Sequence, residues 1–507
     1  MRFAAALSLF LPLAAFPHPC ESCHPAEVKG FAQTGMGRSL HPARSEPDGS
    51  FEHTGSGTRF LMRSNRNGVF QRMTHGGENS DYLIDSVVGS GNRASCFLAR
   101  VGDHLFQSPV CFYKDRGYDM APGYEDSPAP GFSRPVTVEC LLCHSGKPLP
   151  IANSVNRYES PAFAEEGISC VRCHGNVSAH LKRPVRGSIV NPARLTRVRR
   201  NSVCEQCHLV GAARVLNPGK TFADFRPGQQ LEEVFTTYVE KPTPFKVVSH
   251  AEQLSQSRCE RESNGRLWCG TCHDPHNKPA AAAAYFRERC LGCHQRPFPA
   301  SHPARTSNCL PCHMPQRETD DGGHTAFTDH RIAARPGRAE ENDGSGQLVA
   351  WRDPPPEYKT RNLGLALLNA GAREGSAARI EQSYRLLVEA EKTFPSDAAV
   401  LTGIGTALQS RGESASAAKM FERVIELRPD DAIAEENAGM AWLEARDRQA
   451  AARHFVRALA RDPLLLPDIE ALLRIYRESG DQAAEAALLE QVRQAMRTVP
   501  RAVRSPP

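Results

Sequence analysis

Residues 269–313 read CGTCHDPHNKPAAAAAYFRERCLGCHQRPFPASHPARTSNCLPCH, and they hold three copies of the pattern Cys-x-x-Cys-His. Four more copies precede them, so the pattern takes up 14 of the 17 Cys. The chain's own Cys and His frequencies give roughly 0.02 copies by chance, so seven copies need a chemical explanation. The motifs are Cys20/Cys23/His24, Cys140/Cys143/His144, Cys170/Cys173/His174, Cys204/Cys207/His208, Cys269/Cys272/His273, Cys290/Cys293/His294 and Cys309/Cys312/His313.

Cys-x-x-Cys-His is the attachment pattern of c-type haem. The two Cys reach the two vinyl edges of one porphyrin, and the His that follows binds the iron. Zinc is the main competitor, because Cys-x-x-Cys knuckles in pairs make tetrahedral thiolate sites. Seven knuckles is an odd number, and a zinc ribbon gives no reason for a His after every second Cys. We therefore expect seven covalently attached haems c, held by the 14 motif Cys and ligated by the seven motif His.

So large a number of haems affects the fold that we expect. Residues 17–335 carry one haem for about every 45 residues, and each porphyrin is a large apolar body that replaces side chains in a core. We expect a multihaem cytochrome domain with sparse, mainly helical secondary structure. The three closely spaced motifs at residues 269–313 should hold a tight group of haems.

The second axial ligands must come from outside the motifs. Residues 17–335 contain 11 further His, enough for all seven irons to be bis-His, which favours electron transfer over catalysis at an open iron. His180 and His276 lie too close to their own motifs to reach the far side of the same iron, so each is expected on a neighbouring haem. The candidate distal His are His53, His180, His276, His302, His324 and His330, ahead of His18, His41, His75, His104 and His250. Met36 is a further candidate, since a thioether ligand raises the potential of a haem.

The N-terminus and the overall charge indicate the compartment and exclude some partners. Residues 1–16 join one Arg to an apolar stretch and then small residues, which predicts a cleaved secretory signal peptide and export, for example to the periplasm. No apolar run is long enough for a transmembrane helix in the mature chain. The net charge of +5, from 62 bases and 57 acids, is too balanced to indicate nucleic acid binding.

Residues 49–135 carry no haem motif and consist of short alternating segments separated by Asn-Gly, Gly-Gly and Gly-Asp, typical of strands and turns. We expect a small β-rich insert beside the first haem. A hairpin turn at Gly102-Asp103 would bring Cys96 and Cys111 nearly opposite each other. A disulfide there and two free thiols both remain open, while Cys259 has no evident partner.

After residue 335 the composition changes to a polar linker, residues 336–357, rich in Pro and Gly and without Cys. A period of 34 residues follows: Pro395, Pro429 and Pro463 are evenly spaced, Gly405 recurs as Gly439, and Phe421 recurs as Phe455. This period is typical of tetratricopeptide repeats, in which helix pairs stack into a solenoid. We expect an all-α domain of three to four repeats over residues 358–507. It would bind a protein or peptide, or else serve only as a structural cap or dimerisation surface.

The quoted motifs and their surroundings resemble a known family. The stretches CESCHPAEVKGFAQTGMG, GISCVRCHGNVSAH, SVCEQCHLVG, LWCGTCHDPHN, ERCLGCH, NCLPCHMP and HTAFTDHRI are similar to exported multihaem cytochromes c related to the tetrahaem partner of hydroxylamine oxidoreductase, in versions that carry tetratricopeptide repeats. The resemblance covers residues 18–335. It implies electron transfer between redox partner proteins through stacked haem pairs. Tetrahaem members have a His where this chain has Met36, and the extra haems prevent a direct transfer of their arrangement.

Three functions remain open at this point. The first is an exported electron carrier that uses its repeats to dock a redox partner. The second is an oxidoreductase that acts on a small nitrogen or sulfur compound, which needs an iron with an open distal side. Haem 1 would be that site if Met36 does not bind. The third is a scaffold in which the repeats matter more than the haems.

Overall fold

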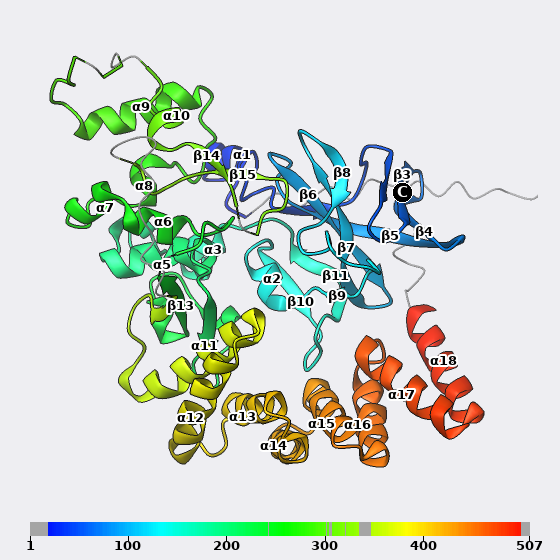
Figure 1. The fold of residues 1–507 in the computed structure, drawn as a ribbon. Helices are drawn as coiled ribbons and strands as arrows, with labels where there is room; N and C mark the ends of the chain where they lie inside the picture. The colour runs from blue at the N-terminus through cyan, green and yellow to red at the C-terminus, as the bar shows by residue number, and fades with distance from the viewer. Residues whose placement is uncertain are drawn as a thin grey trace, which may run out of the picture.

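The computed structural model describes residues 19–241, 243–300, 302–303, 307–319, 321–333 and 346–497. Along the chain, an antiparallel sheet comes first, short motif-bearing segments follow, and a curved array of helix pairs ends the described part (Figure 1). The expected signal peptide and residues 336–345 of the expected linker lie outside the described residues.

The N-terminal part is built on a nine-stranded antiparallel sheet. Seven strands pair in the order β2-β3-β4-β5-β6-β7-β8, while β1 pairs with β5 and β9 with β7. The two ends of this order, β2 and β8, approach each other, so the sheet nearly closes. The strands are β1 (Leu40–Pro42), β2 (Gly49–His53), β3 (Thr58–Asn65), β4 (Gly68–His75), β5 (Glu78–Val88), β6 (Ala94–Val101), β7 (His104–Tyr113), β8 (Gly117–Met120) and β9 (Arg134–Pro135).

This sheet corrects the expected fold class. A sparse, mainly helical domain with a small β-rich insert was predicted because haems were assumed to supply most of the core. The sheet instead buries its own side chains, including Phe60, Val87 and Phe97, each at most 1% exposed. Alternating apolar residues along strands of 8 to 11 residues are sufficient to form that core without a cofactor. The N-terminal half is therefore β-rich.

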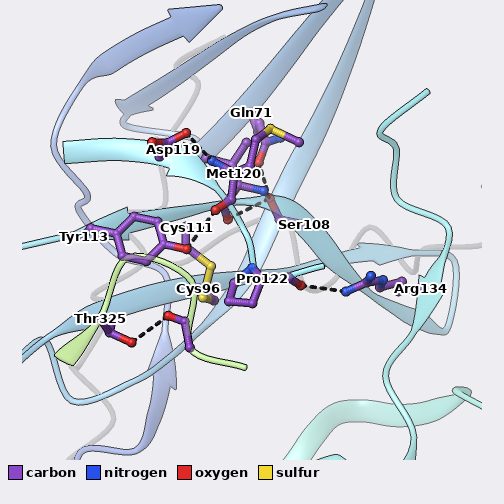
Figure 2. Close-up of a disulfide and its surroundings, with 12 residues drawn as sticks. Gln71, Cys96, Ser108, Cys111, Tyr113, Asp119, Met120, Pro122, Arg134 and Thr325 are labelled. Carbon is purple, nitrogen blue, oxygen red and sulfur yellow. Dashed lines mark hydrogen bonds between the residues drawn. A yellow bond between two sulfur atoms is a disulfide. The ribbon is translucent and has the colours of Figure 1, made fainter. Parts of the chain in front are cut away.

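The hairpin of β6 and β7 contains a disulfide, one of the two possibilities that the sequence left open. Cys96 and Cys111 lie opposite each other in the strand register. They form a disulfide, with Cα atoms 4.2 Å apart (Figure 2). Tyr113, on the same strand as Cys111, donates from its hydroxyl to the carbonyl of Met120 over 2.8 Å and so ties β7 to β8. The alternative of two free thiols is not what the structure shows.

The motif-bearing segments are mostly short. The helices are α1 (Pro25–Phe31), α2 (Val138–Leu142), α3 (Val171–His174), α4 (Ser178–Lys182), α5 (Arg197–His208), α6 (His250–Gln256), α7 (Arg258–Glu262), α8 (Cys269–Cys272), α9 (Ala282–Cys293) and α10 (Leu310–His313). Single 3₁₀ turns are η1 (Pro192–Arg194), η2 (Phe222–Asp224) and η3 (Leu231–Glu233). Small antiparallel sheets join β10 (Lys147–Pro150) to β11 (Tyr158–Glu165), β12 (Ala213–Leu216) to β13 (Phe235–Lys241) and β16 (Gln347–Ala350), and β14 (Gln316–Glu318) to β15 (Ala326–Thr328).

Residues 346–497 end in four helix pairs with the architecture of tetratricopeptide repeats. After η4 (Pro356–Tyr358) these are α11 (Lys359–Glu374) with α12 (Ala377–Thr393), α13 (Ala398–Ser410) with α14 (Ser414–Leu427), α15 (Ala432–Glu444) with α16 (Arg448–Arg461), and α17 (Leu466–Ser479) with α18 (Gln482–Arg497). Asp397 and Asp431, 34 residues apart, cap α13 and α15 by accepting from backbone amides of the first turn. The predicted period thus corresponds to one helix pair.

The repeat array contacts the rest of the chain at both ends. At its start, Arg361 on α11 donates to the carbonyl of Leu216 over 2.7 Å. Near its end, His104 on β7 is bonded through Nε2 to Asp462 over 2.6 Å. Arg157, just before β11, donates to the carbonyl of Arg461 over 2.9 Å. The array therefore arches from the β12–β13 sheet to the large sheet (Figure 1).

We predict that Gly439→Val destabilises the array. A Cβ at Gly439 would lie 2.6 Å from the ring of fully buried Phe455, and Gly405 has the same relation to Phe421 one repeat earlier. Overpacking of this kind costs about 1–3 kcal/mol, which chemical denaturation of the holoprotein would measure. Lys419→Ala, at an exposed helix position, is the control. Equal stability of the two variants would contradict the packing.

Asp468 gives a pH-dependent prediction. Its carboxylate is fully buried, and neither oxygen has a hydrogen-bond partner. Burial raises the pKa of Asp468 to about 8, and the nearby charges of Glu436 and Asp462 add to the effect. The folded chain therefore holds a proton that the unfolded chain releases above pH 4, so stability falls as the pH rises toward 8.

Asp468→Asn should remove this dependence. The stability gained over the parent should grow by up to about 1.4 kcal/mol per pH unit between about pH 5 and 7. Urea unfolding at several pH values measures it, with exposed Asp430→Asn as the control. If the gain is the same at every pH, Asp468 does not hold the proton.

Candidate functional site

Each Cys-x-x-Cys-His motif is part of a helical turn. In the motifs ending in His24, His174, His273, His294 and His313, the His amide donates to the carbonyl of the first Cys over 2.8–3.0 Å. Residues three apart in such a turn lie on the same side, so the two thiols of a motif face one way. This is the local geometry that two thioether bonds to one porphyrin require.

Four motif His each lie opposite a second His from another segment. Two imidazoles on opposite sides of one metal ion, each bound at about 2.0–2.1 Å, have ring centres about 6 Å apart. The four pairs have this spacing, with ring planes 11–27° apart. They are His24 with His180 at 6.4 Å, His174 with His276 at 5.9 Å, His273 with His330 at 6.2 Å, and His313 with His302 at 6.1 Å.

The hydrogen bonds of these rings orient them for ligation through Nε2. Nδ1 of His174 is bonded to the carbonyl of Val190 over 2.8 Å, and Nδ1 of His313 to that of Ala333 over 2.7 Å. Nδ1 of His180, His302 and His330 is engaged in the same way, with Ser188, Pro303 and Thr328. A metal-bound His almost always donates its second ring N–H to such an acceptor.

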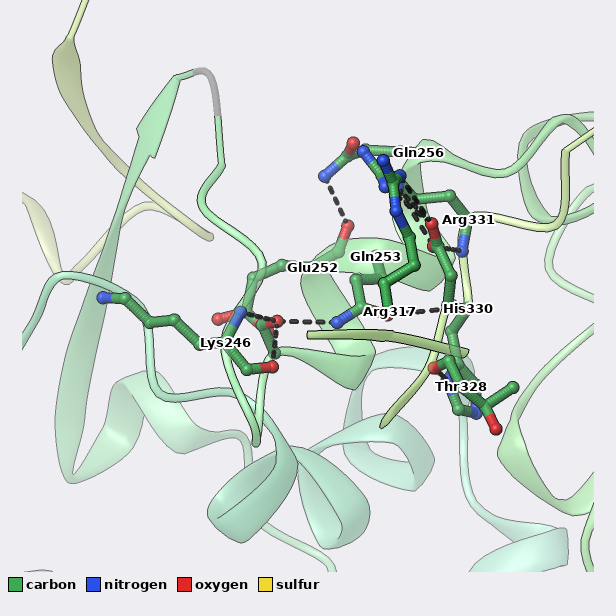
Figure 3. A network of polar contacts seen from close by, with 10 residues as sticks. Lys246, Glu252, Gln253, Gln256, Arg317, Thr328, His330 and Arg331 are labelled. Carbon is green, nitrogen blue, oxygen red and sulfur yellow. Dashed lines mark hydrogen bonds and ion pairs between the residues drawn. The ribbon is translucent and has the colours of Figure 1, made fainter. Parts of the chain in front are cut away.

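His330 is held by the polar network of Figure 3. Its backbone amide donates to the side-chain carbonyl of Gln253 on α6 over 2.8 Å. The next residue, Arg331, donates to buried Asp329, and Arg317 on β14 donates to the same carboxylate over 3.3 Å. These charge-assisted bonds fix the loop after β15 and thereby the ring that faces His273.

His250, ranked behind other candidates in the sequence, lies close to a motif His. It lies at the start of α6, and its ring centre is 5.1 Å from that of His208, with the two planes at 89°. Nδ1 of each ring is buried without a hydrogen-bond partner. Burial lowers the pKa of His208 to about 4, and that of His250 is lowered as well. No spacing in the sequence marks His250, because 41 residues separate it from His208.

The remaining candidates lie elsewhere. His53, on β2, is bonded to Ser56 and to the carbonyl of Glu125, within the large sheet region. His324 contacts Tyr113 and lies near Asp119 and Arg116. The ring opposite His24 belongs to His180, and Met36 is half-buried.

The motifs lie next to one another in space. Thiols of different motifs are hydrogen-bonded in four pairs: Cys20 with Cys170, Cys143 with Cys207, Cys204 with Cys269, and Cys290 with Cys309. Two further approaches, of Cys173 to Cys204 and of Cys272 to Cys290, link these pairs. All seven motifs therefore belong to one continuous series.

The segment with the last three motifs lacks a core of its own. None of the described residues from 258 to 321 is buried, although they include Phe286 and Phe298, which contact His273 and His302. By contrast, α11 alone buries nine residues. A segment that leaves its apolar side chains uncovered fits a large flat apolar group between its helices.

A small pocket lies beside the contact of Cys143 with Cys207. Its lining combines aromatic walls, two guanidinium groups and one motif thiol. The residues are Glu139, Leu142, Cys143, Arg172, Gln206, Arg214, Phe222, Phe225 and Phe235. Apolar walls with convergent cations suit a flat apolar group that carries carboxylates. Together with the ring spacings, the described residues thus fit haem.

Four motif thiols are exposed: Cys23, Cys140, Cys293 and Cys312. Cys23 accepts from the adjacent Ser22 hydroxyl over 3.8 Å. The attachment of haem to the 14 motif Cys stays a prediction from the motifs.

The described residues lack two further features. They contain no cluster of three or more His, Cys, Asp or Glu placed to hold a metal ion. A haem iron takes only two axial ligands from the protein, so the His pairs are not clusters of that kind. Within the same residues, no helix has the length and apolar character to cross a membrane.

Buried ion pairs position α5, which carries the fourth motif. Arg352, after β16, donates to Glu205 on α5 over 2.6 Å and to Glu232 over 2.9 Å. Both carboxylates are at most 9% exposed in their side chains. The start of the repeat domain is thereby joined to a motif helix.

We predict that Arg352→Met lowers the free energy of unfolding by about 3–5 kcal/mol, because it leaves two buried carboxylates without their cation. Denaturant unfolding followed by circular dichroism measures the loss. Arg385→Met removes an exposed pair with Glu381 and should change stability by no more than about 1 kcal/mol. A similar small change for Arg352→Met would show that the pairs do not hold α5.

The similarity of this chain to known proteins consists of partial matches with solved structures. No protein-family model matches the chain, and no curated protein matches it. Among solved structures, MamA is 15% identical over 27% of this chain and 79% of its own, with a TM-score of 0.24. The first tetratricopeptide domain of human RPAP3 is 16% identical over 25% of this chain and 96% of its own, with a TM-score of 0.21. An O-GlcNAc transferase mutant of Thermobaculum terrenum is 19% identical over 28% of this chain and 27% of its own, with a TM-score of 0.25.

Proposed function

We propose that this chain is an exported multihaem c-type cytochrome that transfers electrons between redox partner proteins through seven covalent haems. The observation that carries the proposal is the spacing of 5.9–6.4 Å between four motif His and a second His. Ring pairs at this distance, with Nδ1 bonded to backbone or side-chain oxygens, are what bis-His ligation requires.

The motif Cys would hold each haem, and the motif His would provide the proximal ligand. His180, His276, His330 and His302 would be the distal ligands of haems 1, 3, 5 and 7, and His250 is placed to serve haem 4. Bound haem supplies reversible one-electron chemistry. The protein's contribution is to fill both axial positions and to exclude small molecules from them, which favours electron transfer over catalysis.

The series of contacts between motifs supports transfer along the chain of haems. Thiols of neighbouring motifs touch, so porphyrins attached to them would lie with their edges close together. The first and third motifs stand at one end of the series, and the sixth and seventh at the other. Electrons would enter at one end and leave at the other.

In this proposal the repeat array contacts other parts of the same chain as well as partner proteins. It bonds Arg361 to the carbonyl of Leu216 and Asp462 to His104 on β7, so it braces the motif-bearing part. Docking of a further protein on its outer surface would be an added role. Deletion of residues 358–507 is therefore expected to loosen the haem region as well as to remove a docking surface.

Mass spectrometry of the purified holoprotein tests the proposal first, and seven covalent haems are expected. Electron paramagnetic resonance of the oxidised protein should then show low-spin signals from haems 1, 3, 5 and 7. A polypeptide mass without haem, from cells that attach haem c to other proteins, would overturn the proposal. A high-spin signal from haem 1 would turn attention to the alternative, an oxidoreductase with an open iron.

We predict that His276→Ala converts one haem to the high-spin state, because it removes the ring opposite His174. Absorption and electron paramagnetic resonance spectra measure the spin state, and haem content by mass should stay at seven. His53→Ala is the matched control, since His53 bonds to Ser56 and Glu125 instead of facing a motif ring. Spectra unchanged by His276→Ala would show that His276 is not a ligand.

A further inference from the structure

The segment around the third motif is unusually basic. Residues 167–204 contain eight Lys or Arg and no Asp or Glu, although the whole chain has 62 bases and 57 acids. The charge is thus concentrated in one short stretch. The balanced composition of the whole chain conceals it.

The most exposed part of this stretch is the end of α4 and the loop that follows it. Lys182, Arg183 and Arg186 are exposed there, and in the part of the chain that the structure describes they form no ion pair. Leu181 and Val185, between them, are 50% and 46% exposed. We call these five residues the basic loop. Exposed apolar side chains surrounded by unpaired cations are typical of a protein-binding surface and not of a solvated face.

The basic loop begins directly after the ring expected to serve haem 1. His180, on α4, faces His24, and Ser188 at the far end of the loop bonds to Nδ1 of His180 over 2.9 Å. The first and third motifs meet at Cys20 and Cys170. The loop therefore lies at one end of the series of motifs.

Positive charge nearby reinforces the loop. Arg194 and Arg199 are exposed and, among the described residues, form no ion pair. Arg197 is the exception, since it pairs with Glu260. The local field therefore attracts an anionic surface and would speed its approach.

We propose that the basic loop docks an acidic electron-transfer protein, which exchanges single electrons with the chain at the first and third motifs. This rests on the proposed function. The partner loses one electron, the chain gains it, and no bond forms or breaks. A protein is favoured over an anionic membrane because the loop stands beside the His24–His180 pair, where an electron would have to enter.

The test uses the triple variant K182E/R183E/R186E of the holoprotein. The control is R59E/R63E/R66E, which makes the same change of charge at exposed positions on β3 and its turn. The probe is a plant-type [2Fe–2S] ferredoxin, a small acidic protein. Its oxidised form is used to measure binding, and its reduced form to measure the rate of haem reduction by stopped flow.

At about 20 mM ionic strength we expect the loop variant to lose at least about tenfold in both binding and rate, and the control variant less than about twofold. At about 500 mM the differences should disappear, because salt screens exposed charges. Reduction by methyl viologen, which needs no docking, should be equal in all three proteins. Equal losses in the two variants would overturn the proposal.

Two further outcomes separate the alternatives. Loss of binding to vesicles of anionic phospholipid, with ferredoxin binding intact, would assign the loop to a membrane surface and overturn the proposal. Absence of haem, or failure of methyl viologen to reduce the parent protein, would overturn the proposed function itself. Normal reduction by viologen with salt-independent reduction by ferredoxin would overturn only the docking.

Discussion

Pairs of imidazole rings about 6 Å apart are the constraint on which the motif-bearing part of this protein depends. Each pair joins segments that are distant in sequence, as His24 and His180 are, or His273 and His330. Short helices of four or five residues cannot hold such pairs by themselves. The large sheet, the buried ion pairs of Arg352 and the repeat array supply the rigid surroundings in which the pairs are kept.

Sequence reasoning located the motifs, the hairpin and the repeats because each leaves a local pattern. Cys96 and Cys111 could be placed opposite each other from one turn signal, and the period of 34 could be read from Pro and Gly alone. The size of the sheet was underestimated, because strand pairing across residues 40–135 and nearly closed ends depend on contacts that no local pattern shows. The proximity of His250 to His208 and His330 was not predictable for the same reason, since the three residues come from distant segments.

The repeat domain is attached to the rest of the chain in two places, which restricts the surface it can offer to partners. A solenoid with two free ends would offer its whole surface to partners. Here Arg361 fixes one end and Asp462 the other, through contacts that include fully buried side chains. Burial raises the pKa of Asp468, which lies near the second contact, so the stability of this part of the domain depends on pH.

The contacts between thiols of different motifs bear on how the protein matures. Cys143 interacts with Cys207, and Cys204 with Cys269, in the folded chain. In the exported cytochrome proposed above, a cross-link between neighbouring motifs would consume two attachment points at once. Haem attachment in that cytochrome would therefore have to precede oxidation of these thiols, whereas Cys96 and Cys111 have to be oxidised to form their disulfide. Such a polypeptide would need reductant and oxidant at different sites during its biogenesis.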